Sequence, residues 1–334
     1  MSQIIHTVDS NGSTAAASAC EKFALDVLVG LSEWRKSIPS IHHYDAEGSR
    51  LFNEITKLEE YYLTRCEIET LERNKEHLAS LLSNGPFNVI EFGPGDGSKT
   101  KTLIQHLIGK QVEFQYIPID ISKSALEGLI ADYRTCFAEL EINGLVADYF
   151  AGIKWLNHRY KRRNLVLFLG SNIGNFDHGQ ARLFLRNLWV SLNKGDLVLI
   201  GFDLKKDIDL LLRAYNDPHG ITAEFNLNML RRINNELGGG FDISKFRHFG
   251  TYDVFNGAME SYLVSQVEQE VLVEAIGRSF PFRAWEPIHT EYSYKYHESD
   301  MSDLAKDTGF VVRDIVYDSR KYFADTVWEV AKSG

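Results

Sequence analysis

The chain has 334 residues, 44% of them hydrophobic and 25% charged, so it carries enough apolar material for a packed core and is not a disordered chain. Its 46 acidic and 36 basic residues give a net charge of −10, which disfavours nucleic acid as a partner. The three cysteines are far apart, the N-terminus lacks a signal-peptide pattern, and no apolar run is long enough to span a bilayer. We therefore expect a soluble, cytoplasmic protein with no disulfide, no metal site and no membrane partner.

Helices are predicted in the first part of the chain. Residues 1–20 are small and polar, and we expect them to form a flexible tail. Apolar residues at helical spacing predict a helix within 21–36, and two more helices follow at 51–58 and at about 66–82. The apolar positions of the first helix are Phe23, Val27, Leu31 and Trp34.

Short β-rich runs alternate with helical segments after residue 86. The predicted strands are 88–92, 114–119, 143–147, 165–169 and 197–202, and the predicted helices are 99–108, 123–137 and 180–192. Alternation of this kind is typical of βαβ units, which build a parallel sheet with helices on both faces. Right-handed crossovers restrict the topology to a few doubly wound α/β arrangements.

The alternation breaks between about residues 205 and 295. Two helices, 207–215 and 222–237, lead into runs that look antiparallel, such as 261–263 with 268–273. We interpret this segment as an α+β region inserted into the doubly wound domain.

The chain closes with a helix at 301–308 and two strand-like runs at 310–317 and 326–330. A helix followed by a hairpin ends one branch of the doubly wound folds.

A glycine-rich turn is the sharpest local motif. Gly93, Gly95 and Gly97 follow the strand 88–92 and open a helix, so the backbone there can pass close to a ligand. The turn lacks the Gly-Lys-Ser or Gly-Lys-Thr ending of a phosphate loop, because Ser98 precedes Lys99, and its glycine spacing departs from the GxGxxG of dinucleotide binders. Glu91, near the end of the strand, is common in S-adenosylmethionine binders.

Two later strands also end in residues suited to a nucleoside. Asp120 ends the second strand, where a carboxylate can accept both ribose hydroxyls. Asp148 and Tyr149 follow the third strand, where a carboxylate can meet the adenine amino group and a ring can stack on the base. The combination predicts an adenosine ligand at the switch point of the sheet and looks like the class I S-adenosylmethionine methyltransferase fold.

Several further motifs carry a family resemblance over roughly residues 40–330. They are His43-Tyr44-Asp45 with Gly48-Ser49, Leu51-Phe52 with Ile55, the stretch EYYLTR at 60–65, FLGSNIGNF at 168–176, AYND at 214–217 with TAEFN at 222–226, and TEYSYKY at 290–296. Together they resemble the histidine-specific Nα-methyltransferase family of ergothioneine biosynthesis. Relatives of that family include fungal enzymes that methylate a prenylated tryptophan and domains of ovothiol biosynthesis.

The resemblance implies a set of cofactor-binding residues for S-adenosyl-L-methionine. Gly93 and Lys99 would lie at the methionine end of the cofactor. Asp120 would bind the ribose, and Asp148 and Tyr149 would hold the adenine.

The resemblance also implies how the substrate amine is held. Asn175 and Tyr215 would fix the α-carboxylate and the amine of the substrate. Tyr61, with Tyr44 nearby, would face the amine, which makes Tyr44, Tyr61 and Asn175 the candidate catalytic residues. Phe52 is implied as a further substrate-binding residue.

The imidazole side of the substrate is assigned to one strand-like run. Glu291 and Ser293 alternate along it, so both face the same side, and the resemblance implies that they hydrogen-bond the imidazole. Two positions depart from the family pattern. Ser261 stands where several members place a methionine against the imidazole, and Asn172 replaces the usual threonine of the GSTIGN motif; both border the substrate side chain.

The resemblance implies a split domain organisation. Residues 21–66 and 205–295 would form a discontinuous substrate-binding domain, after the tail of residues 1–20. Residues 67–204 and 296–334 would form the cofactor-binding methyltransferase domain. The expected activity is three successive methylations of the α-amine of L-histidine, giving Nα,Nα,Nα-trimethylhistidine (hercynine).

Three alternatives stay open on the sequence alone. The acceptor could be another aromatic amino acid, tryptophan among them, or a thiolated histidine. The chain could be a cofactor-binding module without catalysis, against which the intact Tyr61, Asn175 and Tyr215 argue. A nicotinamide oxidoreductase is disfavoured by the glycine spacing. The oligomeric state is not set by the sequence, and a monomer is compatible with it.

Overall fold

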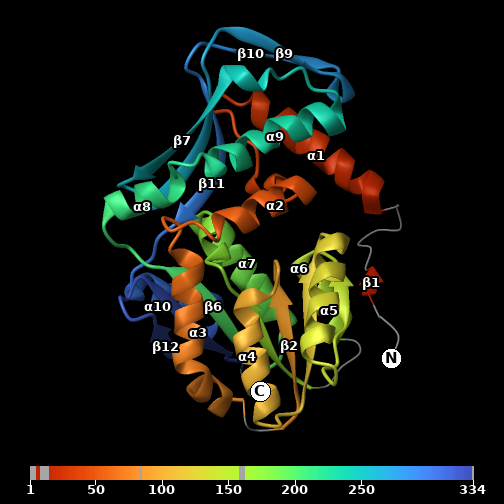
Figure 1. The fold of residues 1–334 in the computed structure, drawn as a ribbon, viewed down its shortest axis with the longest axis vertical. Coiled ribbons are helices and arrows are strands. Elements are labelled where there is room, and N and C mark those ends of the chain that lie inside the picture. The colour runs from red at the N-terminus through yellow and green to blue at the C-terminus, as the bar shows by residue number, and fades with distance from the viewer. Residues whose placement is uncertain (1–4, 8–14, 83–84, 158–161, 333–334) are drawn as a thin grey trace. The chain divides into compact units, whose positions relative to one another are not determined.

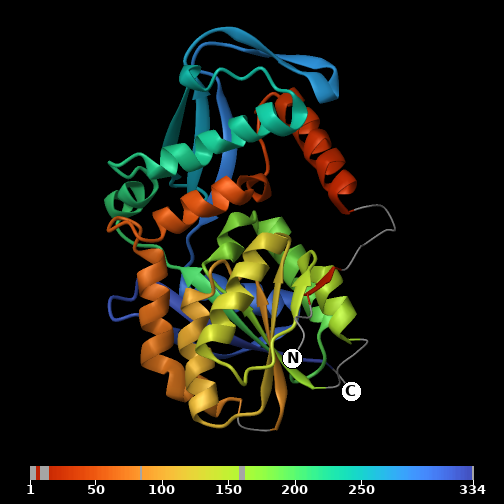
Figure 2. The ribbon, with the colours of Figure 1, turned by 45° about the vertical axis from the view of Figure 1, so that its right-hand side comes forward.

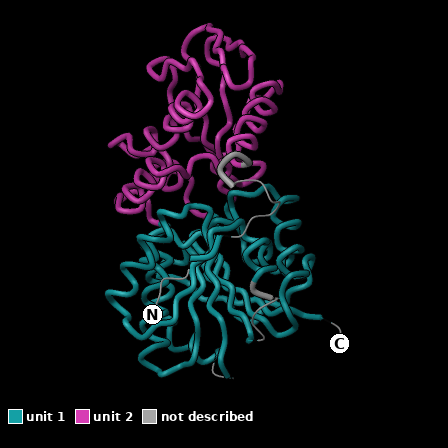
Figure 3. The backbone as a smooth tube through the Cα atoms, turned by 90° about the vertical axis from the view of Figure 1, so that its right-hand side faces the viewer, with its two compact units in different colours: residues 1–10, 63–205, 295–334 teal, residues 11–62, 206–294 magenta. Residues whose placement is uncertain are grey.

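The structure is a computed structural model that describes residues 5–7, 15–82, 85–157 and 162–332. The chain divides into two compact units (Figure 3). The sheet unit consists of residues 1–10, 63–205 and 295–334, and the insert unit of residues 11–62 and 206–294. These bounds lie within a few residues of those predicted between the cofactor-binding and substrate-binding domains, whose functional assignment stays a prediction.

The sheet unit contains one eight-stranded sheet in the order β1-β4-β3-β2-β5-β6-β13-β12. The strands are β1 (Ile5–Thr7), β2 (Phe87–Phe92), β3 (Phe114–Asp120), β4 (Gly144–Val146), β5 (Arg163–Phe168), β6 (Leu197–Asp203), β12 (Phe310–Tyr317) and β13 (Phe323–Val330). Adjacent strands are parallel in the part of the sheet that runs β1-β4-β3-β2-β5-β6. Strand β13 is antiparallel to both β6 and β12. The chain moves outward from β2 to β4 and then returns to β5, so the strand order reverses between β2 and β5, which is where doubly wound sheets bind ligands.

Helices cover both faces of this sheet (Figure 2). They are α3 (Leu63–Ser80), α4 (Ser98–Gly109), α5 (Lys123–Cys136), α6 (Tyr149–Asn157), α7 (His178–Ser191) and α10 (Glu298–Thr308). α3 packs beside α4, and α7 packs beside both α6 and α10. Because both faces are covered, β2 is buried along its whole length, which explains its continuous apolar pattern. The predicted α/β alternation and the closing helix and hairpin are confirmed.

The predicted flexible tail is wrong in part. Residues Ile5–Thr7 form β1, which extends the sheet by pairing with β4, and α1 begins at Ala15 rather than at residue 21. The pairing is parallel and links segments far apart in the chain, so no local sequence pattern reveals it. The other residues between 1 and 14 lie outside the described residues.

The insert unit combines helices with two antiparallel sheets (Figure 1). The helices are α1 (Ala15–Ser32), α2 (Ala46–Ile55), α8 (Ile208–Tyr215) and α9 (Ile221–Leu237), with short 3₁₀ turns η1 (Ser40–His43), η3 (Ile243–Lys245) and η4 (Glu274–Ile276). The first sheet has the order β11-β8-β7, from β7 (Phe246–Asp253), β8 (Ala258–Ser265) and β11 (Pro287–Tyr294). The second sheet pairs β9 (Gln269–Val273) with β10 (Arg278–Phe282).

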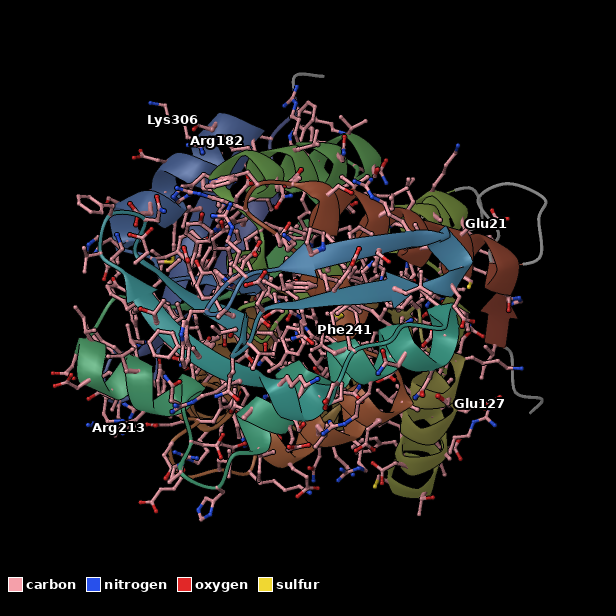
Figure 4. The ribbon with its side chains drawn as sticks, turned by 90° about the horizontal axis from the view of Figure 1, so that it is seen from above. Glu21, Glu127, Arg182, Arg213, Phe241 and Lys306 are labelled. Carbon is pink, nitrogen blue, oxygen red and sulfur yellow. The ribbon has the colours of Figure 1, made fainter. Side chains whose placement is uncertain are left out.

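One core fills the insert unit. Phe23, Val27 and Leu31 of α1 pack with apolar residues of α9 and both sheets, as their helical spacing predicts. Trp34, predicted on the same stripe, is 85% exposed because α1 ends at Ser32. Figure 4 shows Phe241 among the side chains of this core, whereas Arg213 on α8 points outward.

Two predictions for this unit are wrong. Residues 261–263 do not pair with 268–273: β8 is the central strand with β7 and β11 on its two edges, so β9 pairs with β10 instead. The second helix begins at Ala46 rather than at residue 51, because the Asp45 carboxylate accepts a hydrogen bond from the Gly48 N–H at 2.7 Å and caps α2 there. In the part of the chain that the structure describes, no helix has the length and apolarity needed to cross a bilayer.

Candidate active site

The glycine turn lies directly after β2, at the carboxyl edge of the sheet. Gly93 has φ +57° and Gly97 has φ +72°, a region that favours glycine. A Cβ on Gly93 would lie 3.1 Å from the Tyr149 hydroxyl, and one on Gly97 would lie 2.7 Å from the Tyr133 ring. The turn therefore requires these glycines and brings the backbone close to the edge where a ligand would bind.

Glu91 does not face that edge. It is buried, and its two carboxylate oxygens accept hydrogen bonds from the hydroxyls of Thr100 on α4 and Tyr116 on β3. Burial raises the pKa of Glu91, and the two hydroxyls oppose this shift. The residue braces the start of α4 against the sheet, so it supports the glycine turn rather than offering a ligand group.

Asp120 stands at the end of β3, as predicted. Its Oδ1 accepts a hydrogen bond from the Ser122 N–H at 2.8 Å. Burial raises the pKa of Asp120, while the N–H groups of Ser122 and Ile121 lower it. An acidic acceptor next to a glycine turn, without a phosphate-binding loop, fits the adenosyl part of S-adenosylmethionine.

Asp148 and Tyr149 start α6, a helix that was not predicted. The exposed Asp148 caps it, because Oδ1 accepts from the N–H groups of Phe150 at 3.0 Å and Ala151 at 2.9 Å. The Tyr149 ring stacks on Phe92 with 4.6 Å between ring centroids, and its hydroxyl lies beside Gly93. One face of the ring is thus taken by Phe92, so only the other face can meet a base.

Lys99 lies in the first turn of α4. Its Nζ is 2.9 Å from Oε2 of Glu67 on α3, and a Cβ on Gly170 would lie 2.8 Å from the same nitrogen. Burial lowers the pKa of Lys99, but the charge and hydrogen bond of Glu67 outweigh it and the pKa is raised. Glu67 was not predicted as a site residue. The signal was an acid on the buried stripe of α3, four residues from both Leu63 and Leu71.

A second turn follows β5. Gly170 and Ser171 both have positive φ, at +79° and +55°, and the 3₁₀ turn η2 (Asn172–Asn175) comes next. The Asn172 amide nitrogen lies 3.9 Å from the Cβ position of Gly93 and 3.7 Å from that of Gly170. Asn172 therefore lies against the glycine turn, and Asn175 ends η2 partly exposed.

Within the insert unit, the predicted aromatic residues form a connected group. Ring centroids are 5.7 Å apart for Tyr44 and Phe52, 6.2 Å for Phe52 and Tyr61, and 6.5 Å for Tyr61 and Tyr215. Phe225, on α9, contacts both Tyr44 and Phe52 and was not singled out beforehand. An apolar side chain at regular helical spacing gives no sign that it belongs to a site.

The predicted imidazole-binding residues lie on one sheet face. Glu291 and Ser293 alternate on β11, and in the register of the sheet Ser261 pairs with Glu291 and Met259 with Ser293. Directly paired residues of antiparallel strands project from the same face. The Tyr215 hydroxyl donates to Ser293 Oγ at 2.6 Å, so four of the predicted residues share this face. Met259, on the same face, was missed.

The strand order of the sheet unit, with a glycine turn after β2 and an acid at the end of β3, defines a class I methyltransferase fold, the class of enzymes that use S-adenosylmethionine. Residues 23–330 match the family described as histidine-specific, S-adenosylmethionine-dependent methyltransferase. The chain belongs to this family.

Several curated proteins are similar over most of the chain. A Histidine N-alpha-methyltransferase of Mycolicibacterium smegmatis is 36% identical over 294 residues, which cover 87% of this chain and 90% of that protein. Ergothioneine biosynthesis protein 1 of Neurospora crassa is 32% identical and aligns with 82% of this chain and 31% of its own length. An L-tryptophan methyltransferase of Psilocybe serbica is 25% identical over 92% of each chain.

Proposed function

We propose that this protein transfers methyl groups from S-adenosylmethionine to the α-amine of L-histidine three times, giving hercynine. The observation that carries the proposal is the polar face of β11, where Glu291 and Ser293 stand side by side and Tyr215 donates to Ser293. Family membership supports it, as do the relatives named Histidine N-alpha-methyltransferase and Ergothioneine biosynthesis protein 1.

The cofactor residues are proposed on the sheet unit. When bound, S-adenosylmethionine supplies an electrophilic methyl group on a sulfonium. Asp120 would accept the ribose hydroxyls, and Asp148 and Tyr149 would hold the adenine. Gly93 and Lys99 would hold the methionine end.

The substrate amine must be neutral, with its lone pair directed at the methyl carbon. We assign its alignment to Tyr61, with Tyr44 nearby, and to Asn175, because a phenol and an amide can orient an amine without stabilising the ammonium, as a buried carboxylate would. Alignment is the main contribution a protein can make here, since well-oriented reactants reach effective molarities of about 10⁵–10⁸ M. Tyrosine faces also tolerate the cation that forms as methyl groups accumulate.

The hydrogen-bond directions on β11 suit an imidazole. The Ser293 hydroxyl accepts from Tyr215, and it would donate to the unprotonated imidazole nitrogen. Glu291 can accept the N–H of the other nitrogen. Asn175 and Tyr215 would fix the α-carboxylate and the amine of the substrate.

The choice of substrate would also depend on Glu291 and Ser293. A site built to hydrogen-bond a polar ring rejects an analogue that lacks the partners by about 10⁴–10⁵ in favourable cases, because the polar groups of the site are left unpaired. Ser261 is 1% exposed and lies opposite Glu291, where a longer side chain would narrow the site. A modified histidine, such as a thiolated one, is therefore the second candidate acceptor.

Calorimetric titration of amino acids in the presence of S-adenosylhomocysteine tests the assignment. We expect L-histidine and its mono- and dimethyl forms to bind, and tryptophan and phenylalanine to bind much more weakly. Equal binding of histidine and tryptophan would contradict the proposed role of β11.

We further propose that the enzyme works in the cytoplasm. The described Cys20, Cys66 and Cys136 are all free thiols, as suits a reducing compartment. Burial raises the pKa of the Cys66 thiol to about 11, which keeps it unreactive. Fractionation of cells that express the chain would test this location.

A further inference from the structure

A buried group of charged residues lies beneath the proposed methionine end of the cofactor site. Glu67 on α3 is 0% exposed, and each of its carboxylate oxygens has a different partner. Oε1 accepts the Gly170 N–H at 2.6 Å, and Oε2 lies 2.9 Å from Lys99 Nζ. One carboxylate therefore links the turn after β5 to the first turn of α4.

Two glycines make room for this ion pair. A Cβ on Gly201 of β6 would lie 2.3 Å from Glu67 Oε1, and a Cβ on Gly170 would lie 2.8 Å from Lys99 Nζ. Both distances are too short for any other residue to fit unless the charged groups move. The carboxylate and the ammonium are thus each seated against a glycine, which restricts where they can lie.

We propose that Glu67 is a positioning residue of the cofactor site, which holds the Lys99 ammonium in place and charged so that Lys99 can bind the carboxylate at the methionine end of S-adenosylmethionine. The inference rests on the proposed placement of Lys99 at that end. Lys99 Nζ and Glu67 Oε2 form an ion pair at 2.9 Å, and an ammonium has three N–H donors, so Lys99 can also bind a second carboxylate. A largely buried lysine without an ionised partner would lose its proton instead.

The other acidic groups that face Lys99 do not pair with its ammonium in this arrangement. They are Glu91 of β2 and Asp325 of β13, whose pKa values are both raised, chiefly by burial. Asp325 is fully buried, and neither of its oxygens has a hydrogen-bond partner within the described structure. Glu91 is occupied by two hydroxyls. Glu67 is therefore the carboxylate that pairs with Lys99.

The test is the affinity for S-adenosylhomocysteine, which has the same carboxylate, measured by calorimetry for Glu67→Gln across pH 7 to about 9.5. At pH 7.5 we expect an affinity about 10- to 150-fold lower than that of the parent, the range of a charge-assisted hydrogen bond. The affinity of the variant should fall further as pH rises, because its Lys99 ammonium loses its proton. In the parent the raised pKa of Lys99 keeps the ammonium protonated, so the parent should not show this pH-dependent loss of affinity. A merely structural role of Glu67 would not change the pH profile.

Asp325 provides the matched control. Asp325→Asn removes a buried acid to which the proposal gives no role in binding, so its affinity should stay within about threefold of the parent. Asp325 could ionise once residue 67 is neutral, so Glu67→Gln is also combined with Asp325→Asn. The loss of affinity should be larger in this double variant than in Glu67→Gln alone. An unchanged affinity in that double variant overturns the proposal.

Lys99→Met separates this inference from the placement on which it rests. If Lys99→Met binds like the parent, Lys99 is not at the methionine end. If Lys99→Met is weak while the double variant of Glu67→Gln with Asp325→Asn is parent-like, only the role of Glu67 fails. Because Glu67 acts through Lys99, Glu67→Gln should not lower the affinity any further in a chain that already carries Lys99→Met. Additive losses of affinity from the two substitutions would contradict the proposal. If Glu67→Gln does not fold, Glu67→Asp keeps the charge but cannot reach both partners, and parent-like affinity there would also overturn the proposal.

Discussion

Replacing Glu291 by alanine removes the proposed acceptor for the imidazole N–H. A hydrogen bond to a charged group contributes about 1.5–3 kcal/mol, so the affinity for L-histidine should fall about 10- to 150-fold. Glu291 is only partly buried, which places the expected loss toward the lower end of that range. The affinity for S-adenosylmethionine should not change, because the proposed cofactor residues lie on other elements. Discrimination against tryptophan should weaken, since its ring has no use for a carboxylate there.

Glu260 gives a matched control for this variant. It is a neighbouring glutamate on β8, but it pairs with Tyr292 and therefore projects from the opposite face of the sheet, where Tyr262 donates to it. Glu260→Gln should bind histidine like the parent. Calorimetric titration with histidine and tryptophan, each with S-adenosylhomocysteine present, measures both effects. Parent-like histidine affinity in Glu291→Ala would refute the assignment of the imidazole to β11.

Three further predictions address the cofactor, the amine and stability. Asp120→Ala should lower cofactor affinity about tenfold or more by calorimetry, because two ribose hydroxyls lose a charged acceptor, and an unchanged affinity would remove Asp120 from the site. Tyr61→Phe should slow all three methylations while leaving cofactor affinity intact, and unchanged rates would exclude the hydroxyl from amine alignment. Burial lowers the pKa of His43 to about 4, below the 6.5 of an exposed histidine. The unfolded chain thus binds more protons between these values, so the contribution of His43 to the free energy of unfolding should drop by about 2 kcal/mol from pH 7 to pH 5. Urea unfolding of the parent and of His43→Gln at both pH values checks this, and equal pH slopes would contradict it.

The parts of the fold that follow local patterns could be predicted from the sequence. Strands such as β2 and β3 are short apolar runs between amphipathic helices, and the glycine turn after β2 sits at a fixed place in that alternation. Pairings between distant segments could not be predicted in this way. β1 joins β4, and β9 turns away from β8 to β10, because the edges of β8 are already taken.

In the candidate site, too, local motifs predicted some residues, whereas others depend on tertiary packing. Ser261, Glu291 and Ser293 were named from motifs, and the register of β8 with β11 places them on one face. Glu67 was hidden in a helix rich in glutamate, since only the packing of α3 separates a buried acid from its exposed neighbours. The stacking of Tyr149 on Phe92 also depends on tertiary packing, which its place after β4 does not reveal.

The most direct test of the account is a competition reaction analysed by mass spectrometry. The purified chain is given S-adenosylmethionine with equal concentrations of L-histidine and L-tryptophan, and a thiolated histidine in a parallel reaction. The account predicts that mono-, di- and trimethylhistidine appear in that order and that hercynine accumulates while tryptophan stays unmodified. Faster methylation of tryptophan than of histidine, with Glu291 intact, would contradict it.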